Sequence, residues 1–355
     1  MKHWDIFCKV VDNYGDIGVS WRLARQLAAE QGLPVRLWVD ELAAFVRLCP
    51  QWVAGSSQCE VNGVWVSQWT LSETVQPGQV VICAFGCDLP PSWLERMAAK
   101  TPPPLWINLE YLSAEDWVEG CHGLPSPHPR LPLRQYFFYP GFTPSTGGLL
   151  REAELTLRPA VQLPNYRLKI SLFSYDQPFV VELLQCWAAH PQPVLCLVAP
   201  GVLNDRLAGW AGSRGALTVE EVPFVSQPEY DARLAACQLN FVRGEDSFVR
   251  AQWAQHPFVW QIYPQQEEAH RIKLEAFLAR YLAGLDVPST QAVRAFWHAW
   301  NVPAAGALAH TWPAFAAALP ALQSHAERWA QQLFIQPDLA SQLVSFAAHR
   351  VECGL

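Results

Sequence analysis

The sequence predicts an α/β protein with two Rossmann-like domains, each built on a mainly parallel sheet covered by helices. Along most of the 355 residues, short apolar runs alternate with stretches of helical periodicity. The length also exceeds what one ordinary hydrophobic core holds. Residues 150–168 interrupt the alternation, because they lack an apolar period and contain Pro159 and Pro164. We therefore expect the domains to meet in that segment.

The first domain, residues 1–155, and the second, residues 165–335, are expected to repeat the same alternation. Strands joined by helices form parallel sheets with right-handed crossovers. A final helix, 337–352, carries Leu339, Leu343 and Phe346 on one face, so it can pack back on the first domain. Expected strands in the first domain are 4–11, 35–39, 64–69, 80–85, 105–109 and 135–139, with helices after the first strand, at 41–48 and after Ser113 as N-cap. Expected strands in the second are 168–173, 194–199, 217–224, 238–242 and 257–263, with helices at 179–189 and 228–237.

Composition and charge exclude several classes of protein. Only 16% of residues are charged and 51% are apolar, which is typical of a folded chain rather than a disordered one. The formal charge of −7 disfavours non-specific nucleic-acid binding, which needs basic surface. Apolar runs stay below membrane-spanning length, and Asp5 and Lys9 interrupt the N-terminal apolar segment that a secretory signal needs. We expect a cytoplasmic protein with no nucleic-acid or membrane partner.

The ten cysteines do not have the spacing of a metal site. Cys8, Cys83, Cys186, Cys196 and Cys237 lie within or beside apolar segments, as buried free thiols do. Cys83 and Cys87 are followed by no second pair at ligand spacing. The sequence predicts reduced structural thiols and no metal.

Residues 11–19, VDNYGDIGV, form the turn between the first strand and the first helix. Asp12 and Asp16 stand there with two glycines, at the carboxyl end of a strand, where open α/β sheets bind their ligands. One interpretation is structural: Asp12 and Asn13 start a turn, and Asp16 favours the helix dipole. The other is catalytic, with the two carboxylates facing a substrate. The spacing differs from the G-x-G-x-x-G pattern of dinucleotide-binding proteins.

A second polar glycine turn, residues 243–250, follows a strand of the second domain. Gly244 allows a close approach of the backbone to a ligand, and Ser247 fits a helix N-cap. Arg243 can hold a phosphate through two hydrogen bonds, and Glu245 can accept from ribose hydroxyls. A capped helix with a surface Arg–Glu pair explains the same residues without a ligand.

Residues 5–25, DIFCKVVDNYGDIGVSWRLAR, closely resemble the opening of bacterial elongation factor P arginine rhamnosyltransferases. Residues 108–115, 223–227 and 243–252 resemble further motifs of that family, in the same order. The resemblance implies a GT-B glycosyltransferase fold, with two domains facing a cleft. It implies transfer of rhamnose from dTDP-β-L-rhamnose to a loop arginine of translation elongation factor P, with inversion and with neither a metal nor another cofactor.

The resemblance also assigns roles to individual residues, with the acceptor bound by the first domain and the dTDP-sugar by the second. In the first domain Asp16 is expected to be the catalytic base, with Asp12 supporting it or binding the arginine. The other expected substrate contacts are Asn13, Gly15, Phe173, Tyr175, Phe224, Gln227, Arg243, Gly244, Glu245, Asp246 and Ser247.

Two alternatives remain open at this level. The first is a GT-B transferase that uses another sugar nucleotide or acceptor. The second is a non-catalytic protein that binds a nucleotide or a translation factor. The presence of both Asp12 and Asp16 disfavours the second alternative, because a pure binding protein needs no base.

Overall fold

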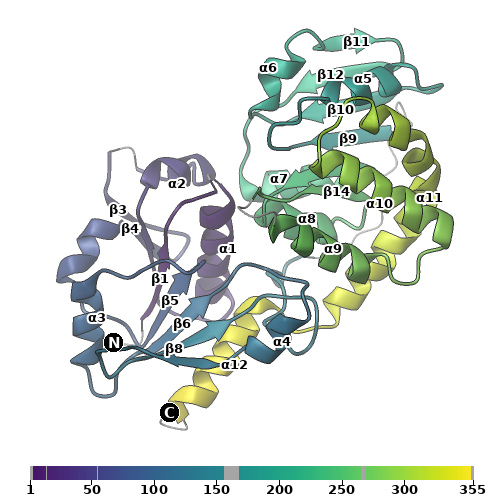
Figure 1. Ribbon diagram of the computed structural model, residues 1–355. Coiled ribbons are helices and arrows are strands. Elements are labelled where there is room, and N and C mark those ends of the chain that lie inside the picture. Colours follow the sequence, from purple (N-terminus) through teal and green to yellow (C-terminus); the bar gives the residue numbers. More distant parts are fainter. Residues whose placement is uncertain (1–2, 13, 54, 156–167, 265–268, 353–355) are drawn as a thin grey trace. The chain divides into compact units, whose positions relative to one another are not determined.

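The computed structural model describes residues 3–12, 14–53, 55–155, 168–264 and 269–352 (Figure 1). The chain divides into two compact units. The first unit comprises Met1–Thr156 and Ile335–Leu355, and the second comprises Leu157–Phe334. The division falls within the segment that interrupts the alternation of strands and helices. Among the described helices, none is both long enough and apolar enough to cross a bilayer.

The first unit is built on a sheet with the strand order β3-β4-β2-β1-β5-β6-β8-β7. Its six inner strands are parallel, while β3 and β7 pair antiparallel at the two edges. The strands are β1 Trp4–Cys8, β2 Val35–Val39, β3 Gln58–Val61, β4 Val64–Gln68, β5 Val80–Ala84, β6 Leu105–Leu109, β7 Pro125–Pro127 and β8 Arg134–Phe138.

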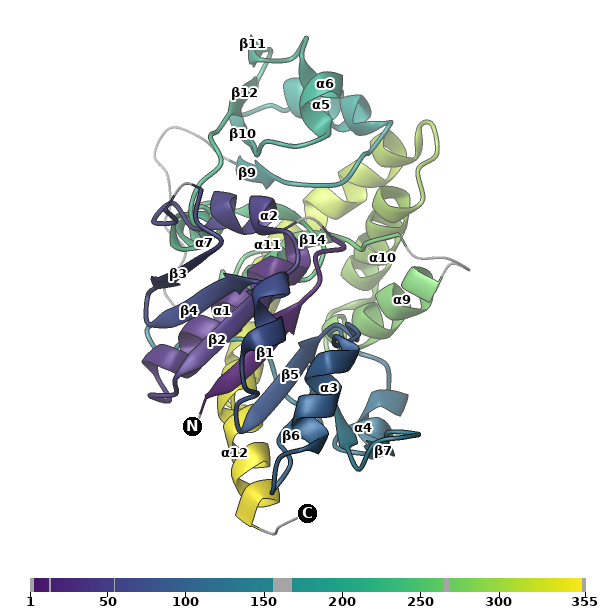
Figure 2. The same ribbon diagram turned by 90° about the vertical axis from the view of Figure 1, so that its left-hand side faces the viewer.

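Helices cover both faces of the first sheet, and Figure 2 shows α3 and α12 on opposite faces. Alternate strand residues such as Phe7 and Cys83 pack with Trp93 and Met97 of α3 in one aromatic core. Successive side chains of a strand point to opposite faces of the sheet, so strands that are apolar on both faces need a layer of helices over each face. The helices are α1 Gly15–Ala29, α2 Leu42–Leu48, α3 Pro91–Ala98, α4 Trp117–Cys121 and α12 Leu339–Glu352, with the 3₁₀ helix η1 at Trp69–Thr74.

The last helix, α12, belongs to the first unit although it follows the whole second unit in the chain (Figure 1). It contacts α1 and β6. Phe346 packs edge-on against the rings of Tyr136 and Phe138 in β8. At the start of the helix, Gln26 of α1 donates to Asp338 over 3.0 Å, and the Leu339 N–H donates to the Leu149 carbonyl over 2.9 Å.

The second unit contains a sheet with the order β11-β12-β10-β9-β13-β14, parallel except for the short edge strand β11. The strands are β9 Leu168–Leu172, β10 Val194–Val198, β11 Gly212–Arg214, β12 Leu217–Glu221, β13 Leu239–Arg243 and β14 Phe258–Gln261. The helices are α5 Val180–Ala188, α6 Leu203–Leu207, α7 Gln227–Ala235, α8 Asp246–Trp253, α9 Ala269–Tyr281, α10 Val287–Asn301 and α11 Ala307–Phe334.

Each sheet has a point at which the strand order reverses. In the first, the chain runs from β1 outward through β2 and β4, then returns to add β5 on the other side of β1. In the second, it runs from β9 through β10 and β12 and returns to add β13 beside β9. Ligands of open α/β sheets bind at such reversals, beyond the carboxyl ends of the strands. The turns after β1, β9 and β13 therefore occupy the favoured positions.

Most predicted elements are present, and their errors have physical causes. The predicted strands at 35–39 and 105–109 have the observed bounds, while β1 ends at Cys8, three residues earlier than expected. The edge strands β3, β7 and β11 were not predicted, because their polar, exposed residues lack an apolar pattern. The helix expected after Ser113 is present as α4, but it begins at Trp117 with Asp116 as N-cap, so the prediction of Ser113 as N-cap is wrong. The Ser113 hydroxyl instead accepts from the Glu115 N–H over 3.1 Å.

The carboxylate of Asp5 anchors the start of the first sheet. It is fully buried and accepts two hydrogen bonds from Arg36, of 2.7 and 2.8 Å. It also accepts from the Trp38 indole over 2.9 Å and from the Gly78 N–H over 2.6 Å. One side chain thus joins β1 and β2 to the residues that lead into β5.

Replacing Asp5 by alanine should strongly destabilise the first unit. Removing one partner of a buried ion pair leaves the other charge uncompensated, which costs about 3–5 kcal/mol. We expect Asp5→Ala to lower the free energy of unfolding by that amount in urea denaturation. The exposed Asp88 provides the control, Asp88→Ala, and equal stability of the two variants would contradict this role.

Candidate functional site

The turn between β1 and α1 is closed by the carboxylate of Asp16. Its Oδ2 atom accepts hydrogen bonds from the N–H groups of Val11 and Asp12, both 2.8 Å long. Asp16 is only 2% exposed. Because a carboxylate oxygen has two lone pairs, these two hydrogen bonds fill Oδ2, and neither of them involves Oδ1.

Gly15 allows the Asp12 side chain to lie against the first residue of α1. A Cβ atom at position 15 would stand 2.6 Å from Asp12 Oδ2, well inside van der Waals contact. The Gly15 N–H also donates to the Asp12 carbonyl over 2.6 Å. The glycine is needed here for close approach, and it brings the Asp12 carboxylate to the turn that Asp16 closes. Asp12 is half-buried, so it is the more accessible of the two carboxylates.

The surroundings of Asp16 have opposing effects on the pKa of its carboxyl group. Burial raises the pKa of the Asp16 carboxyl, and the hydrogen bonds from the Asp12 and Val11 N–H groups and from the Tyr111 hydroxyl oppose the rise. The negative charge of Asp40, just after β2, adds to the rise. The result is a carboxyl whose pKa lies above its ordinary value while three donors still favour its charged form.

Tyr111 was not assigned a role from the sequence, although it lies in the segment 108–115. It follows β6, and its ring stacks on Phe85, which follows β5, with 4.6 Å between ring centroids. Phe85 has a left-handed backbone with φ of 58°, a conformation that costs a bulky residue energy and marks a tightly constrained position. The two aromatic residues thus hold the Tyr111 hydroxyl in reach of Asp16.

In the second unit, Arg243 ends β13 beside two aromatic residues that follow β9. Its guanidinium carbon lies 4.5 Å from the ring centroid of Phe173 and 4.6 Å from that of Tyr175. Cation–π contacts at these distances hold a guanidinium in place while leaving its N–H groups available to other acceptors. The structure therefore brings together Phe173, Tyr175 and Arg243 at the reversal of the second sheet.

The turn after β13 is organised by Ser247, but not as the sequence predicted. Helix α8 begins at Asp246 with Glu245 as N-cap, so the prediction of Ser247 as N-cap is wrong. The Ser247 hydroxyl instead accepts from the Arg243 N–H over 3.0 Å and donates to the Arg243 carbonyl. Gly244 has a φ of 60°, which glycine adopts without strain, and its carbonyl accepts from the Trp260 indole over 2.7 Å.

The remaining predicted residues surround this turn. Gln227, the first residue of α7, donates from its amide to the Asp246 carboxylate over 3.3 Å. Phe224 is 37% exposed. Glu245 is partly exposed at the start of α8. Tyr230 of α7, which the sequence did not single out, packs edge-on against Phe173 with 5.9 Å between ring centroids.

Asn13 lies outside the described residues, so its predicted contact stays a prediction. Among the described residues, no group of three or more His, Cys, Asp and Glu side chains is arranged to hold a metal ion. The described cysteines are free thiols. Of the five that the sequence placed in apolar surroundings, Cys186 is partly exposed and the other four are buried.

Comparison with known proteins identifies relatives over nearly the whole chain. The family model described as elongation factor P (EF-P) rhamnosyltransferase EarP matches residues 4–348. The chain is 50% identical to a protein-arginine rhamnosyltransferase of Pseudomonas putida, over 97% of this chain and 98% of the relative. It is 35% identical to one of Neisseria meningitidis, over 97% and 96%.

The solved structures agree on the fold. One, from work on EarP-mediated arginine glycosylation of EF-P, matches with a TM-score of 0.65 and 35% identity, over 98% of this chain and 99% of that one. The structure of MurG from Acinetobacter baumannii matches with a TM-score of 0.53 at 12% identity, over 98% of each chain, and shows the fold alone. The predicted GT-B glycosyltransferase fold is confirmed.

Removing the Tyr111 hydroxyl should raise the pKa of Asp16 further. The hydroxyl donates to the carboxylate, so Tyr111→Phe withdraws stabilisation from the charged form alone. We expect the ¹³Cγ signal of Asp16, assigned with Asp16→Asn, to titrate at higher pH in the variant. Tyr139→Phe, in the same unit, is the control, and an unchanged titration in Tyr111→Phe would refute the contact.

Proposed function

The chain belongs to the EF-P rhamnosyltransferase family EarP, and from this membership we propose that it transfers rhamnose from dTDP-β-L-rhamnose to a loop arginine of EF-P. The family match and the identities of 50% and 35% support the acceptor and the reaction type. The site geometry supports the assignment of residues. The observation that supports the proposed function most directly is a buried carboxylate, Asp16. Two backbone N–H groups hold it at the point where the strand order of the first sheet reverses.

The reaction needs a base because arginine is a poor nucleophile. Its guanidinium has a pKa above about 12 and shares its electrons over three nitrogens. We assign Asp12, the more accessible carboxylate, to binding of the guanidinium by charge-assisted hydrogen bonds. Asp16, in drier surroundings and with a raised pKa, is assigned to accept the proton. Such a base removes the proton as the new bond forms, without having to deprotonate free arginine.

The transfer of rhamnose to arginine needs no reactant beyond the two substrates. An arginine Nη atom attacks C1 of rhamnose from the face opposite the nucleotide, and the C1–O bond to dTDP breaks. The dTDP leaves with the electron pair of that bond, and the Nη proton passes to Asp16, which later releases it to water. Inversion at C1 follows from attack opposite the leaving group.

The donor is assigned to the second unit. We propose that the N–H groups of Arg243 bind the diphosphate, since its guanidinium is held in place by the rings of Phe173 and Tyr175. Glu245 is assigned to the ribose and Phe224, with its exposed ring, to the thymine face. Gly244 allows the close approach, and Gln227 and Asp246, which bond to each other, complete the nucleotide contacts.

For Ser247 the geometry supports a different contribution from the one expected. Its hydroxyl is occupied by the Arg243 backbone, so we assign it to fixing the turn that presents Arg243. Arginine and backbone donors can stabilise a departing diphosphate, so we propose that transfer needs no metal. Because the proposed acceptor is a translation factor, we assign the activity to the cytoplasm.

Intact mass spectrometry tests the function directly. The chain is incubated with dTDP-β-L-rhamnose and EF-P, and we expect EF-P to gain one deoxyhexose. Complex formation without a mass gain would support a binding protein instead. Replacement of the loop arginine of EF-P by lysine should abolish the gain, which separates arginine transfer from modification elsewhere.

Replacing Asp16 by asparagine should nearly abolish transfer. The amide can still accept from the turn N–H groups but cannot take the proton, and loss of a general base typically costs about 10²–10⁴-fold. We expect kcat to fall in that range while dTDP binding is unchanged. In the wild type, kcat should fall as the pH drops through the raised pKa of Asp16, because the protonated form is inactive. Asp88→Asn controls for loss of a charge, and near-normal turnover of Asp16→Asn would remove Asp16 from its role.

Substituting Gly15 by alanine tests the Asp12 assignment. The new Cβ would displace the Asp12 carboxylate, 2.6 Å away, and misplacement by about 1 Å can cost on the order of 100-fold. We expect kcat/KM to fall about 10- to 100-fold with Tm unchanged or higher, since alanine suits a helix better than glycine. Gly120→Ala in α4, with nothing within 4 Å of the new Cβ, should leave kcat/KM unchanged, with Tm likewise unchanged or higher. Full activity of Gly15→Ala would separate Asp12 from catalysis.

Replacing Arg243 by alanine should weaken nucleotide binding. Hydrogen bonds from a charged group contribute about 1.5–3 kcal/mol, so the Kd for dTDP should rise about 10- to 100-fold. Isothermal titration calorimetry with dTDP measures this rise. Arg214→Ala, an exposed arginine of the edge strand β11, should bind like the wild type. An unchanged Kd in Arg243→Ala would refute the diphosphate assignment.

A further inference from the structure

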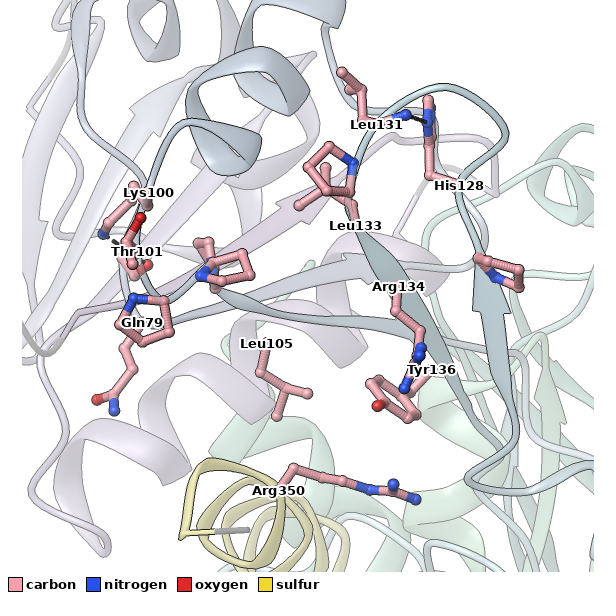
Figure 3. Close-up of a pocket in the computed structure, with 16 residues that line it drawn as sticks. Gln79, Lys100, Thr101, Leu105, His128, Leu131, Leu133, Arg134, Tyr136 and Arg350 are labelled. Atoms are coloured by element: carbon pink, nitrogen blue, oxygen red, sulfur yellow. Dashed lines mark hydrogen bonds between the residues drawn. The ribbon is translucent and has the colours of Figure 1, made fainter. Parts of the chain in front are cut away.

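The first unit contains a pocket of about 900 Å³ that none of the proposed roles uses (Figure 3). Its walls come from the segments that lead into three strands, β5, β6 and β8, and from the last turn of α12. The residues that line it are Gly78, Gln79, Lys100, Thr101, Pro102, Pro103, Pro104, Leu105, Pro127, His128, Leu131, Pro132, Leu133, Arg134, Tyr136 and Arg350.

The pocket lies at the amino ends of the strands, whereas the Asp16 turn lies at their carboxyl ends. Leu105 and Arg134 are the first residues of β6 and β8, and Gln79 directly precedes β5. Asp16 follows the carboxyl end of β1, which runs parallel to all three strands through their pairing. The two sites are therefore separated by the length of the strands, and a ligand in the pocket is distinct from the proposed acceptor site.

The charge of the lining is one-sided. Lys100, Arg134 and Arg350 are cationic, and the described lining residues include no Asp or Glu, although the whole chain has a formal charge of −7. Asp5 contacts Gly78 but is already neutralised by Arg36. The lining thus carries a net positive charge in an acidic protein, which favours an anion.

Hydrogen-bond donors in the pocket are available. Arg134 is exposed, and in the described part of the chain its guanidinium makes no hydrogen bond or ion pair. Tyr136 is 2% exposed, and its hydroxyl has no hydrogen-bond partner among the described residues. A buried hydroxyl without a partner costs about 1–3 kcal/mol, so an oxygen of a ligand would remove that penalty.

The arrangement of these groups suits a ligand with a charged head and an apolar body. Figure 3 shows Arg134 and Tyr136 on one side of the pocket with Arg350 below them, Leu105 near the middle, and Gln79, Lys100 and Thr101 on the opposite side. The Arg350 guanidinium is held 4.6 Å from the Tyr136 ring centroid and 5.2 Å from that of Phe346. Lys100 already donates to the Pro77 carbonyl over 2.7 Å, so it contributes mainly charge. Proline and leucine side chains form the remaining walls.

We propose that this pocket binds a small organic oxyanion, a phosphate ester with an apolar or aromatic body, through Arg134, the Tyr136 hydroxyl and Arg350. Its volume is in the range of small-molecule sites, which combine apolar walls with a few convergent polar groups. A phosphate has oxygens directed at several donors at once, and arginine recognises it through paired hydrogen bonds. The proposal is independent of the assignments made for Asp16 and Arg243.

Calorimetric titration of the full chain with phenyl phosphate tests the proposal. The titrations are done in the Arg243→Ala background, so that the other proposed phosphate site does not contribute. We expect one molecule to bind, and Arg134→Met to raise its Kd about 10-fold or more, as for a lost charge-assisted hydrogen bond. Tyr136→Phe, which removes only the hydroxyl, should raise the Kd about 2- to 10-fold. Arg130→Met, an exposed neighbour outside the pocket, should leave it unchanged.

Three results would overturn the proposal. One is the absence of binding up to about 10 mM phenyl phosphate, a concentration that would fill most of a site with a Kd of about 1 mM or below. Another is an equal Kd in Arg134→Met, Tyr136→Phe and Arg130→Met. The third is inorganic phosphate binding as tightly as phenyl phosphate, because the apolar walls would then contribute nothing. Cooperative thermal unfolding with a Tm no lower than that of the wild type establishes that the variants are folded.

Discussion

The two hydrogen bonds that Asp16 accepts from the Val11 and Asp12 N–H groups are the constraint on which the proposed acceptor site depends. They fix the path of the chain between β1 and α1 and place the carboxylate at 2% exposure. Burial alone would favour the neutral acid, and the donors of the turn and of Tyr111 favour the anion. A raised pKa makes the carboxylate a better proton acceptor, and the donors keep its charged form available to act as a base.

Both units place charged side chains where the strand order of the sheet reverses, and the charges are negative in the first unit and positive in the second. The first places two carboxylates after β1, and the second places a guanidinium at the end of β13, beside Phe173 and Tyr175 after β9. Each position is a reversal of strand order, where the flanking crossovers diverge and leave the strand ends uncovered. In each turn a side chain bonds to the backbone of the same turn, Asp16 in one and Ser247 in the other. This bonding makes the geometry of the polar groups a property of the local chain.

Serines at predicted helix starts show where local reasoning fails. Ser113 and Ser247 both have the sequence context of an N-cap, yet the helices begin at Trp117 and Asp246. Ser247 instead bonds to the backbone of Arg243, four residues earlier. A hydroxyl can satisfy several nearby backbone groups, and the path of the chain selects among them. Tyr111 illustrates the same limit over a longer distance, because its partner Asp16 is ninety-five positions away.

The sequence by itself determined the alternating elements, their division into two units and the two polar turns, because these depend on apolar periodicity and on glycine. It also determined the family, through long matching segments. Only the tertiary structure decided the order of strands, the pairing of Tyr111 with Asp16 and the gathering of Arg134, Tyr136 and Arg350 in one pocket. These features join residues far apart in the chain, and side-chain contacts of that kind follow from packing rather than from local preference.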